Sequence, residues 1–355
     1  MDIEIVTLHA LQNPGSAWQA YALQAYLSPR HNAEIVDYRP PYVESEGKPL
    51  KHLAKLLLHG RAYWRRKRKF GLFMRNWMRL SPRFTSARQL ESADWRADVF
   101  MTGSDQLWNL DFPCGRDPAF YLAFAGGARK IAYSTSVGKK DLDAETRRVL
   151  AEKLQDFKAI SVREKSTARQ LGELLHREVA WVCDPVFLLP RDAYEPFIAR
   201  AKAVPGPYAL VYLSKASPAL DAVVEHYKAK GLKIVLGGGV TKRCRCDVHL
   251  KDMGPEDFVG LISRAEVVVS SSFHATAFCH IFHRPFVTFV PPKNGERIAS
   301  LLEESGLMAH AVSHQGTLPD PGRYDVPIDW ADVDRKLETY IATSKSYLEN
   351  ALQGG

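Results

Sequence analysis

The stretch MDIEIVTLHALQNPGSAWQAYALQAYLSPRHNAEIVDY, residues 1–38, decides the fold class of this chain. Its pattern predicts an apolar strand over residues 3–8, a loop over 9–15, a helix over 16–27 and a second strand over 33–38. A strand, a helix and a strand in so short a stretch form a βαβ unit, which requires a parallel sheet and a right-handed crossover. We therefore expect the chain to begin as a doubly wound, Rossmann-like α/β domain.

The same alternation continues through both halves of the chain. Further strands are predicted at 99–102, 130–133, 159–162 and 179–182 and, in the second half, at 208–213, 233–236, 267–270 and 286–290. The turn residues at 184–190 and 204–207 bracket a short helix, so we place a domain boundary near residue 200. The expected domains are therefore 1–200 and 201–327, followed by a helical segment, 328–355, that crosses back onto the first domain.

Size and composition agree with two globular domains in the cytoplasm. The chain has 355 residues, 46% of them hydrophobic and 25% charged, as in ordinary globular proteins. The acidic start lacks the basic residues of a signal peptide, and no run approaches the length of a membrane span. Cys244 and Cys246 with His249 do not match zinc-ligand spacing, so no bound metal is expected.

The positive charge is concentrated in one segment. The net charge is +8, but the stretch from Lys51 to Arg83 contains eleven Lys or Arg and no Asp or Glu, which leaves the remainder near 8 − 11 = −3. In this basic insertion, residues 48–84, cations alternate with Leu, Trp, Phe and Met at near-helical spacing. We expect it to lie on an anionic membrane surface, apolar face down, at the inner face of the cytoplasmic membrane. A nucleic-acid contact and a solvated helix are the alternatives.

Ligands of open α/β sheets lie beyond the carboxyl ends of the strands, so residues that follow predicted strands are the first site candidates. Ser271, Ser272 and His274 follow the strand at 267–270 and begin a helix. The free N–H groups and the positive end of a helix dipole suit a phosphate or a carboxylate, which His274 would meet. The alternative is that a serine only caps the helix and His274 packs in the core.

Polar residues also follow the first strand after the basic insertion. Asp105, Gln106 and Asn109, beside Ser104, offer the donors and acceptors that sugar hydroxyls need, and Trp108 offers a ring face. A carbohydrate site is one interpretation. The other is an Asx-type turn with a tryptophan in the core.

Four further residues fall after predicted strands or before helices. Arg163 could clamp a carboxylate or phosphate with two hydrogen bonds, or form a surface pair with Glu164. Asn13 and Gly15 before the first helix, and Gly238 within Gly237-Gly238-Gly239, could admit a ligand close to the backbone or form tight turns. No Walker A sequence is present, so ATP hydrolysis of that class is not expected.

Several stretches together resemble the polysaccharide pyruvyl transferase family. In chain order they are QAYAL (19–23), GSDQLWN (103–109), YSTSVG (133–138), VRE (162–164), CDPVFLL (183–189), SSFHAT (271–276) and residues 297–307. A single motif of this kind is weak, but their order and spacing over residues 5–310 are specific.

The resemblance implies a fold similar to that of two-domain (GT-B-like) glycosyltransferases, with two facing Rossmann-like halves. It implies transfer of pyruvate from phosphoenolpyruvate, as a ketal, onto two hydroxyls of a sugar in a lipid-linked polysaccharide or exopolysaccharide precursor, with no cofactor. Arg163 and His274 stand where donor-binding and catalytic residues are expected. Ser272 stands where some members carry an arginine, and Lys139, Lys293 or Arg297 are candidates to replace its charge.

These observations lead to three sets of assigned residues. The catalytic set is His274 with Asp105, which either accepts a proton or only binds. The other sets are the donor-binding residues, Arg163, Ser271, Ser272, Gly238 and Arg297, and the acceptor-binding residues, Asn13, Gly15, Ser104, Gln106, Trp108 and Asn109. We expect Arg163 and His274, from the two domains, to converge on one cleft. A nucleotide-sugar-dependent glycosyltransferase and a non-catalytic module that binds anionic glycans or lipid are the alternative functions.

Overall fold

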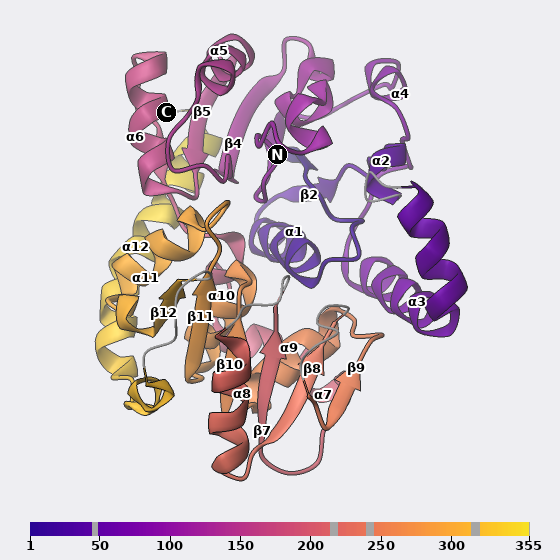
Figure 1. Cartoon of the computed structure of the whole chain (residues 1–355). Helices are drawn as coiled ribbons and strands as arrows, with labels where there is room; N and C mark the ends of the chain where they lie inside the picture. The colour runs from indigo at the N-terminus through magenta and orange to yellow at the C-terminus, as the bar shows by residue number, and fades with distance from the viewer. Residues whose placement is uncertain (45–48, 214–218, 239–244, 314–319, 355) are drawn as a thin grey trace. The chain divides into compact units, whose positions relative to one another are not determined.

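The computed structural model describes residues 1–44, 49–213, 219–238, 245–313 and 320–354, with the backbone alone at 44, 49–59 and 313 (Figure 1). Gly239, Cys244 and the start of the basic insertion lie outside the described residues. The chain divides into two compact units. Unit 1 comprises Met1–Gly60, Phe70–Leu189 and Thr339–Gly355, and unit 2 comprises Arg61–Lys69 and Pro190–Glu338.

Unit 1 is built on a six-stranded parallel sheet. Its strands have the spatial order β2-β1-β3-β4-β5-β6 and the bounds β1 Asp2–Val6, β2 Asn32–Ile35, β3 Val99–Thr102, β4 Arg129–Thr135, β5 Phe157–Val162 and β6 Ala180–Trp181. The chain reverses its direction of strand addition between β1 and β3. The loops that follow these two strands therefore flank a topological switch point, where ligands of such sheets bind.

Helix α1, Pro14–Leu27, connects β1 to β2 and begins at this switch point. The side chain of Asn13 accepts a hydrogen bond from the Gly15 N–H at 2.9 Å, and Pro14 occupies the first helical position, so the start is defined locally. Trp18 is fully buried. The other helices of unit 1 are α2 Pro41–Glu44, α4 Ala87–Glu91, α5 Ala144–Lys153 and α6 Lys165–Leu175, while α3, Pro49–Trp77, contributes residues to both units.

Unit 2 is built on a second six-stranded parallel sheet. Its order is β12-β11-β10-β7-β8-β9, with the bounds β7 Tyr208–Tyr212, β8 Lys233–Gly237, β9 Val248–Leu250, β10 Val267–Ser270, β11 Phe286–Val290 and β12 Ala311–Ser313. Here the switch point lies between β7 and β10, as in a dinucleotide-binding Rossmann sheet. The helices are α7 Glu195–Arg200, α8 Leu220–Ala229, α9 Pro255–Arg264, α10 Phe273–Phe282 and α11 Glu296–Ser305. The two sheets confirm the predicted fold class, two doubly wound parallel α/β domains.

The chain passes from unit 1 to unit 2 at residue 189, not near residue 200. Helix α7 packs against α9, and a Cβ at Gly260 of α9 would lie 2.1 Å from the Cβ of Ala201, so residues 190–201 belong with unit 2. Residues 184–189, which the sequence analysis assigned to the linker, carry the buried side chains of Val186 and Leu188 and lie within unit 1.

The last helix, α12, Trp330–Gln353, contributes to both units. Its residues up to 338 group with unit 2, where the His283 ring stacks on Trp330 with centroids 5.1 Å apart. From residue 339 it groups with unit 1, where Tyr340 stacks on Trp181 at 4.4 Å and the Ser344 hydroxyl accepts from the Cys183 N–H at 2.8 Å.

Replacement of Gly115 by alanine is expected to destabilise unit 1. A Cβ at Gly115 would lie 2.1 Å from the carbonyl oxygen of Asn109, so the loop that begins at the carboxyl end of β3 must move. We expect Gly115→Ala to lower the free energy of unfolding by about 1–3 kcal/mol, as overpacking does. The control is Gly127→Ala, whose Cβ meets no atom within 4 Å. Denaturant unfolding curves that coincide for the two variants would contradict the packing argument.

Candidate active site

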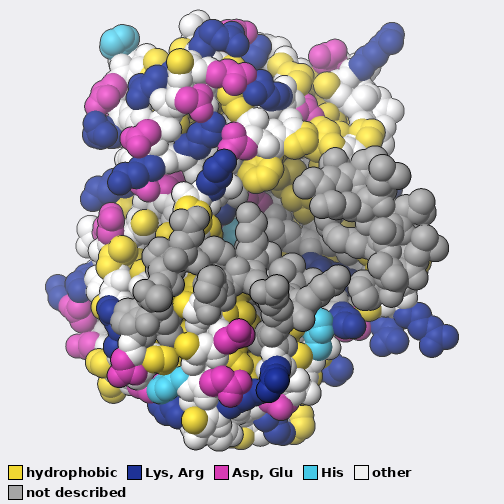
Figure 2. Space-filling model, viewed as in Figure 1, with side chains coloured by type: hydrophobic (Ala, Val, Ile, Leu, Met, Phe, Trp, Pro, Cys, Tyr) yellow, Lys and Arg dark blue, Asp and Glu magenta, His cyan; other side chains and the backbone are white. Residues whose placement is uncertain are grey.

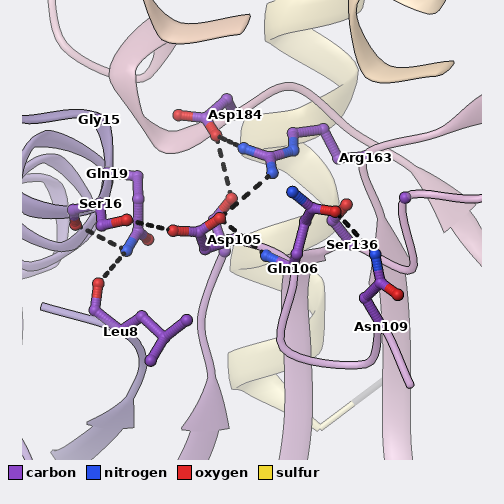
Figure 3. A network of polar contacts seen from close by, with 12 residues as sticks. Leu8, Gly15, Ser16, Gln19, Asp105, Gln106, Asn109, Ser136, Arg163 and Asp184 are labelled. Carbon is purple, nitrogen blue, oxygen red and sulfur yellow. Dashed lines mark hydrogen bonds and ion pairs between the residues drawn. The ribbon is translucent and has the colours of Figure 1, made fainter. Parts of the chain in front are cut away.

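A network of buried polar side chains lies at the switch point of unit 1 (Figure 3). At its centre is Asp105, in the loop after β3. One carboxylate oxygen accepts from the hydroxyl of Ser16, in the first turn of α1, and the other accepts from the Gln106 N–H at 2.8 Å. The nearest guanidinium nitrogen of Arg163 lies 4.0 Å from the same carboxylate. The loops after β1 and β3 are therefore joined through one acidic residue.

Asp105 adopts an unusual backbone conformation. Its φ is +87°, a region that residues with a side chain rarely occupy and that costs about 1–3 kcal/mol. The backbone carbonyl of Asp105 accepts from the N–H groups of Leu107, at 2.8 Å, and Ser136, at 2.9 Å. These bonds hold the strained conformation, which directs the carboxylate toward α1.

Arg163 follows β5 and forms a buried ion pair with Asp184. The guanidinium donates to one oxygen of the Asp184 carboxylate, which also accepts from the Ser104 hydroxyl at 3.0 Å. Arg163 and Asp184 are 2% and 1% exposed, so water contributes little to their solvation. The second Asp184 oxygen accepts from the Val186 N–H at 3.2 Å. Asp184 thus fixes the orientation of the Arg163 guanidinium.

The alternative of a surface pair between Arg163 and Glu164 is wrong. Glu164 is fully buried, and its carboxylate accepts from the Ser136 hydroxyl and from the Gly138 N–H, the latter at 3.0 Å. Both charged residues after β5 therefore belong to the buried network, at the carboxyl ends of β3, β4 and β5.

Three of the predicted acceptor-binding residues are core residues instead. Ser104, Trp108 and Asn109 have no exposed surface, so a sugar cannot contact them in this structure. The Trp108 indole donates to the Phe120 carbonyl at 3.1 Å, and its ring stacks on Tyr121. The alternative of an ordered turn with a core tryptophan holds for this part of the loop.

The other acceptor candidates keep varying access to solvent. Asn13 is exposed, although its side-chain oxygen caps α1, and Gly15 is buried beneath that cap. Gln106 is partly exposed and accepts from the Asn109 amide at 2.8 Å. Asn13 and Gln106 therefore remain the candidates for direct contact with an acceptor.

The start of α10 lies at the switch point of unit 2. Ser272 is the cap, because its hydroxyl accepts from the Ala275 N–H at 3.4 Å. The Ser270 hydroxyl donates to the Tyr212 carbonyl at 2.6 Å and accepts from the Ser272 N–H at 3.0 Å, which ties β10 to β7. His274 lies in the first turn and is 5% exposed. The capping alternative is thus correct for Ser272, and Ser271 is buried beside it.

The two remaining donor-binding candidates of unit 2, Arg297 and Gly238, have different surroundings. The Cζ atom of Arg297 lies 5.7 Å from the ring centroid of Phe273, which places a positive charge beside the start of α10. Gly238 has a φ of +81°, and its N–H donates to the Leu250 carbonyl at 3.1 Å. Gly238 therefore has the backbone conformation of a tight turn, and its backbone donor is already used within unit 2.

Lys139 and Lys293 are the other candidates to replace the charge absent at Ser272. Lys139 lies in unit 1, with its Nζ 2.7 Å from Asp143 and 3.3 Å from Asp111, so two carboxylates balance its charge. Lys293 is exposed and precedes α11. Of the three candidates, Arg297 is the one whose charge the structure places beside the start of α10.

The sequence analysis missed a second polar cluster at the carboxyl ends of β1 and β2. The fully buried His9 ring lies 2.9 Å from the Asp37 carboxylate, which also accepts from Arg39. Burial opposes ionisation of Asp37, but the hydrogen bonds from His9 and Arg39 outweigh it and lower its pKa to about 2. The rule that sites follow strands would have found His9 and Asp184, which lie beyond the predicted strands at 3–8 and 179–182, but not Asp37, which the predicted strand 33–38 includes.

Arg163 and His274 belong to different units, each of which is described by itself, so their convergence on one cleft stays a prediction. Among the described residues, no group of three or more His, Cys, Asp or Glu side chains is arranged to hold a metal ion.

The two six-stranded parallel sheets define a two-domain α/β fold, which is similar to that of solved UDP-GlcNAc 2-epimerases. One similar structure is the UDP-GlcNAc 2-epimerase from Neisseria meningitidis, solved with UDP-GlcNAc. The match covers 99% of this chain and 94% of the epimerase chain, with a TM-score of 0.54 and 11% sequence identity. The match with the UDP-GlcNAc 2-epimerase from Methanocaldococcus jannaschii covers 100% of both chains, again with a TM-score of 0.54 and 11% sequence identity. At this identity the likeness concerns the fold alone.

The chain belongs to the polysaccharide pyruvyl transferase family, whose model matches residues 13–292. This match confirms the resemblance seen in the sequence motifs. A comparison with curated protein sequences finds no significant match. Family membership makes the protein a transferase and implies a polysaccharide acceptor.

Removal of the Asp184 carboxylate is expected to cost far more stability than removal of its neutral partner. Asp184→Ala removes the carboxylate to which the buried Arg163 guanidinium donates, which costs about 3–5 kcal/mol of unfolding free energy. Ser104→Ala removes one neutral hydrogen bond to the same carboxylate and should cost about 1 kcal/mol. Chemical denaturation of the two variants measures the difference. Equal losses would show that Asp184 does not carry the charge balance of this network.

Acidification is expected to weaken unit 2 through His280. Burial lowers the pKa of His280 to about 4 from an ordinary value of 6.5, although its hydrogen bond to the Thr276 carbonyl opposes the shift. Between pH 6.5 and 4, therefore, His280 is protonated in the unfolded chain and stays neutral in the folded chain. The contribution of His280 to the free energy of unfolding is complete above pH 6.5 and is lost as the pH falls toward 4. The total loss is about 3 kcal/mol. His280→Gln should show a flatter decline in urea unfolding between pH 7 and 4, and an unchanged slope would contradict the assignment.

Proposed function

We propose that this protein transfers pyruvate from phosphoenolpyruvate, as a ketal, onto two hydroxyls of a sugar in a lipid-linked polysaccharide precursor. The observation that carries the proposal is the position of His274. In a chain of this family, an imidazole lies in the first turn of α10, at the switch point of unit 2, with the Arg297 guanidinium beside the start of that helix.

The electrostatics of unit 2 support a donor with several negative charges. Phosphoenolpyruvate carries a carboxylate and a phosphate. The positive end of the α10 dipole and the Arg297 guanidinium attract both groups. His274 adds a group that is able to donate and accept a proton. We assign the donor to this end of unit 2.

The electrostatics of unit 1 support a neutral acceptor that donates hydrogen bonds. The Asp105 carboxylate accepts from the hydroxyl of Ser16, in the first turn of α1, so a negative charge already lies beside the start of this helix. The Asp184 and Glu164 carboxylates lie in the same buried network, where the Arg163 guanidinium is the opposing charge. Sugar hydroxyls donate to such groups, whereas a second phosphate would be repelled. We assign the acceptor to this end of unit 1, with Asp105 and Gln106 as its contacts.

The proposed reaction balances without a redox step. A proton adds to the methylene carbon of phosphoenolpyruvate, and C2 becomes electrophilic. One sugar hydroxyl forms a bond to C2 and loses its proton. The C2–O bond to phosphate breaks, and attack by a second hydroxyl, which also loses its proton, closes the ketal. The products are the ketal and inorganic phosphate, with His274 as general acid and base and Asp105 as acceptor of a hydroxyl proton.

Peripheral attachment to the inner face of the cytoplasmic membrane is part of the same proposal, because a lipid-linked acceptor stays at the bilayer. The basic segment from Lys51 to Arg83 supports it through its charge.

Sugar identity is tested by incubation of the protein with phosphoenolpyruvate and a panel of lipid-linked glycans, with the mass of each product as the readout.

Replacement of His274 by alanine is expected to lower kcat by roughly 10² or more, because proton transfer to the donor carbon loses its catalyst. Phosphate release from phosphoenolpyruvate measures the rate, and thermal unfolding shows that the fold is kept. His226→Ala is the matched control, since His226 pairs with Asp325 at the periphery of unit 2.

An active His274→Ala variant would reject the catalytic role of His274. Release of a nucleotide from a nucleotide sugar, in place of phosphate from phosphoenolpyruvate, would support the glycosyltransferase alternative. Acceptor binding without any turnover would support the binding-module alternative.

A further inference from the structure

The apolar side chains in the last third of α3 are covered by the protein itself. Phe70, Phe73 and Met74, in the last third of the helix, are buried, and the Phe73 ring lies 4.9 Å from that of Trp18 in α1. The expectation that the apolar face of the basic insertion rests on lipid is therefore wrong for this part of α3, because those side chains already complete the core of unit 1.

One cation of the helix is neutralised within unit 2. The Nζ atom of Lys69 lies 2.8 Å from the Asp257 carboxylate, which caps the start of α9, and 3.6 Å from Asp252. A Cβ on Gly254 would lie 2.7 Å from the Cβ of Lys69, so the helix packs closely here. Lys69 thus joins the part of α3 that belongs to unit 2, Arg61–Lys69, to the start of α9.

The opposite side of α3 presents cations and an indole to solvent. Arg61, Trp64, Arg65 and Arg68 follow the i, i+3, i+4, i+7 spacing of one helix face, and all four are exposed, with Lys67 beside them. We call these five residues the docking face. Arg65 is 67% exposed and its guanidinium lies 4.0 Å from the Asp252 carboxylate, so its charge remains largely available to solvent. In Figure 2, Lys and Arg side chains gather beside the position of α3 in Figure 1.

Trp64 distinguishes the docking face from an ordinary solvated helix. It is 58% exposed, more than any other tryptophan that the structure describes. The Lys67 ammonium lies 5.5 Å from the centre of the indole ring. An indole flanked by cations is typical of residues that anchor a protein at the headgroup level of a bilayer, where one end is apolar and the other wet.

We propose that the docking face binds the anionic surface of a phospholipid bilayer by charge attraction, with Trp64 as its interfacial anchor. The cations complement anionic headgroups, and the chain from Lys51 to Arg83 holds no acid to oppose them. No helix among the described residues has both the length and the apolar character to cross a bilayer. The inference rests on the proposed function in one respect, since a lipid-linked acceptor gives the protein a reason to work at a membrane.

Sedimentation of the full chain with vesicles tests the proposal. The wild type should bind vesicles that contain phosphatidylglycerol and not vesicles of phosphatidylcholine alone, and high salt should release it. The triple variant Arg61→Gln, Arg65→Gln, Arg68→Gln should lose binding by about 100-fold, because each cation near the surface contributes about fivefold. Trp64→Ala should weaken binding by about tenfold at unchanged net charge.

The matched control removes three arginines of similar exposure on other helices, Arg148→Gln, Arg169→Gln and Arg335→Gln. This variant should bind vesicles as the wild type does. Equal binding by the Arg61, Arg65 and Arg68 variant, or equal binding to neutral vesicles, overturns the proposal. Tight binding of a DNA or RNA oligonucleotide without vesicle binding also overturns it, in favour of a nucleic-acid surface.

The experiments distinguish a failure of the docking-face proposal from a failure of the proposed function. Phosphate release from phosphoenolpyruvate with a water-soluble acceptor does not require a membrane, so the triple variant should retain the wild-type rate. Loss of vesicle binding with full turnover supports the docking face. Absence of turnover in the wild type, with vesicle binding intact, would reject the proposed function and leave the docking face standing.

Discussion

The buried ion pair between Arg163 and Asp184 is the constraint on which the candidate site of unit 1 depends. It joins the loop after β3, through Ser104, to the end of β5 and to the segment after β6. A charge at this depth without its partner costs several kcal/mol, so the three segments must close on one another for the unit to fold. The same pair places the Arg163 guanidinium 4.0 Å from Asp105, whose strained backbone directs its carboxylate to α1.

The two switch points share a topology and differ in charge. In unit 1 the Asp105 carboxylate lies beside the start of the helix after β1, where it accepts from the Ser16 hydroxyl. In unit 2 the start of α10 carries serines, a histidine and a neighbouring guanidinium. The backbone geometry of a parallel sheet creates a ligand site in both places, but side chains decide which ligand is attracted. This difference supports the assignment of an anionic donor to one unit and a hydroxyl-rich acceptor to the other.

The site was predictable where a residue lies directly beyond a strand and uncertain where its role depends on burial. Asp105, Arg163 and His274 were singled out because polar residues that follow apolar strands fall at one edge of the sheet, and the structure places each of them after such a strand. Trp108 was misassigned because its indole is covered by Phe120, Tyr121 and Phe157, which come later in the chain. Asp184 was taken for linker because Asp-Pro is a frequent turn signal, and its ionic partner lies 21 residues earlier.

By itself, the sequence determined the succession of strands and helices, the parallel sheets, the concentration of positive charge and the family, since these follow from short-range patterns and from the order of motifs. The tertiary structure decided which polar residues are buried, which charges are paired and which side of α3 faces solvent. The physical reason is range: burial and ion pairing depend on segments far apart in the chain. The hydrogen bond from the Cys183 N–H to the Ser344 hydroxyl joins residues 161 positions apart, and no local sequence pattern predicts it.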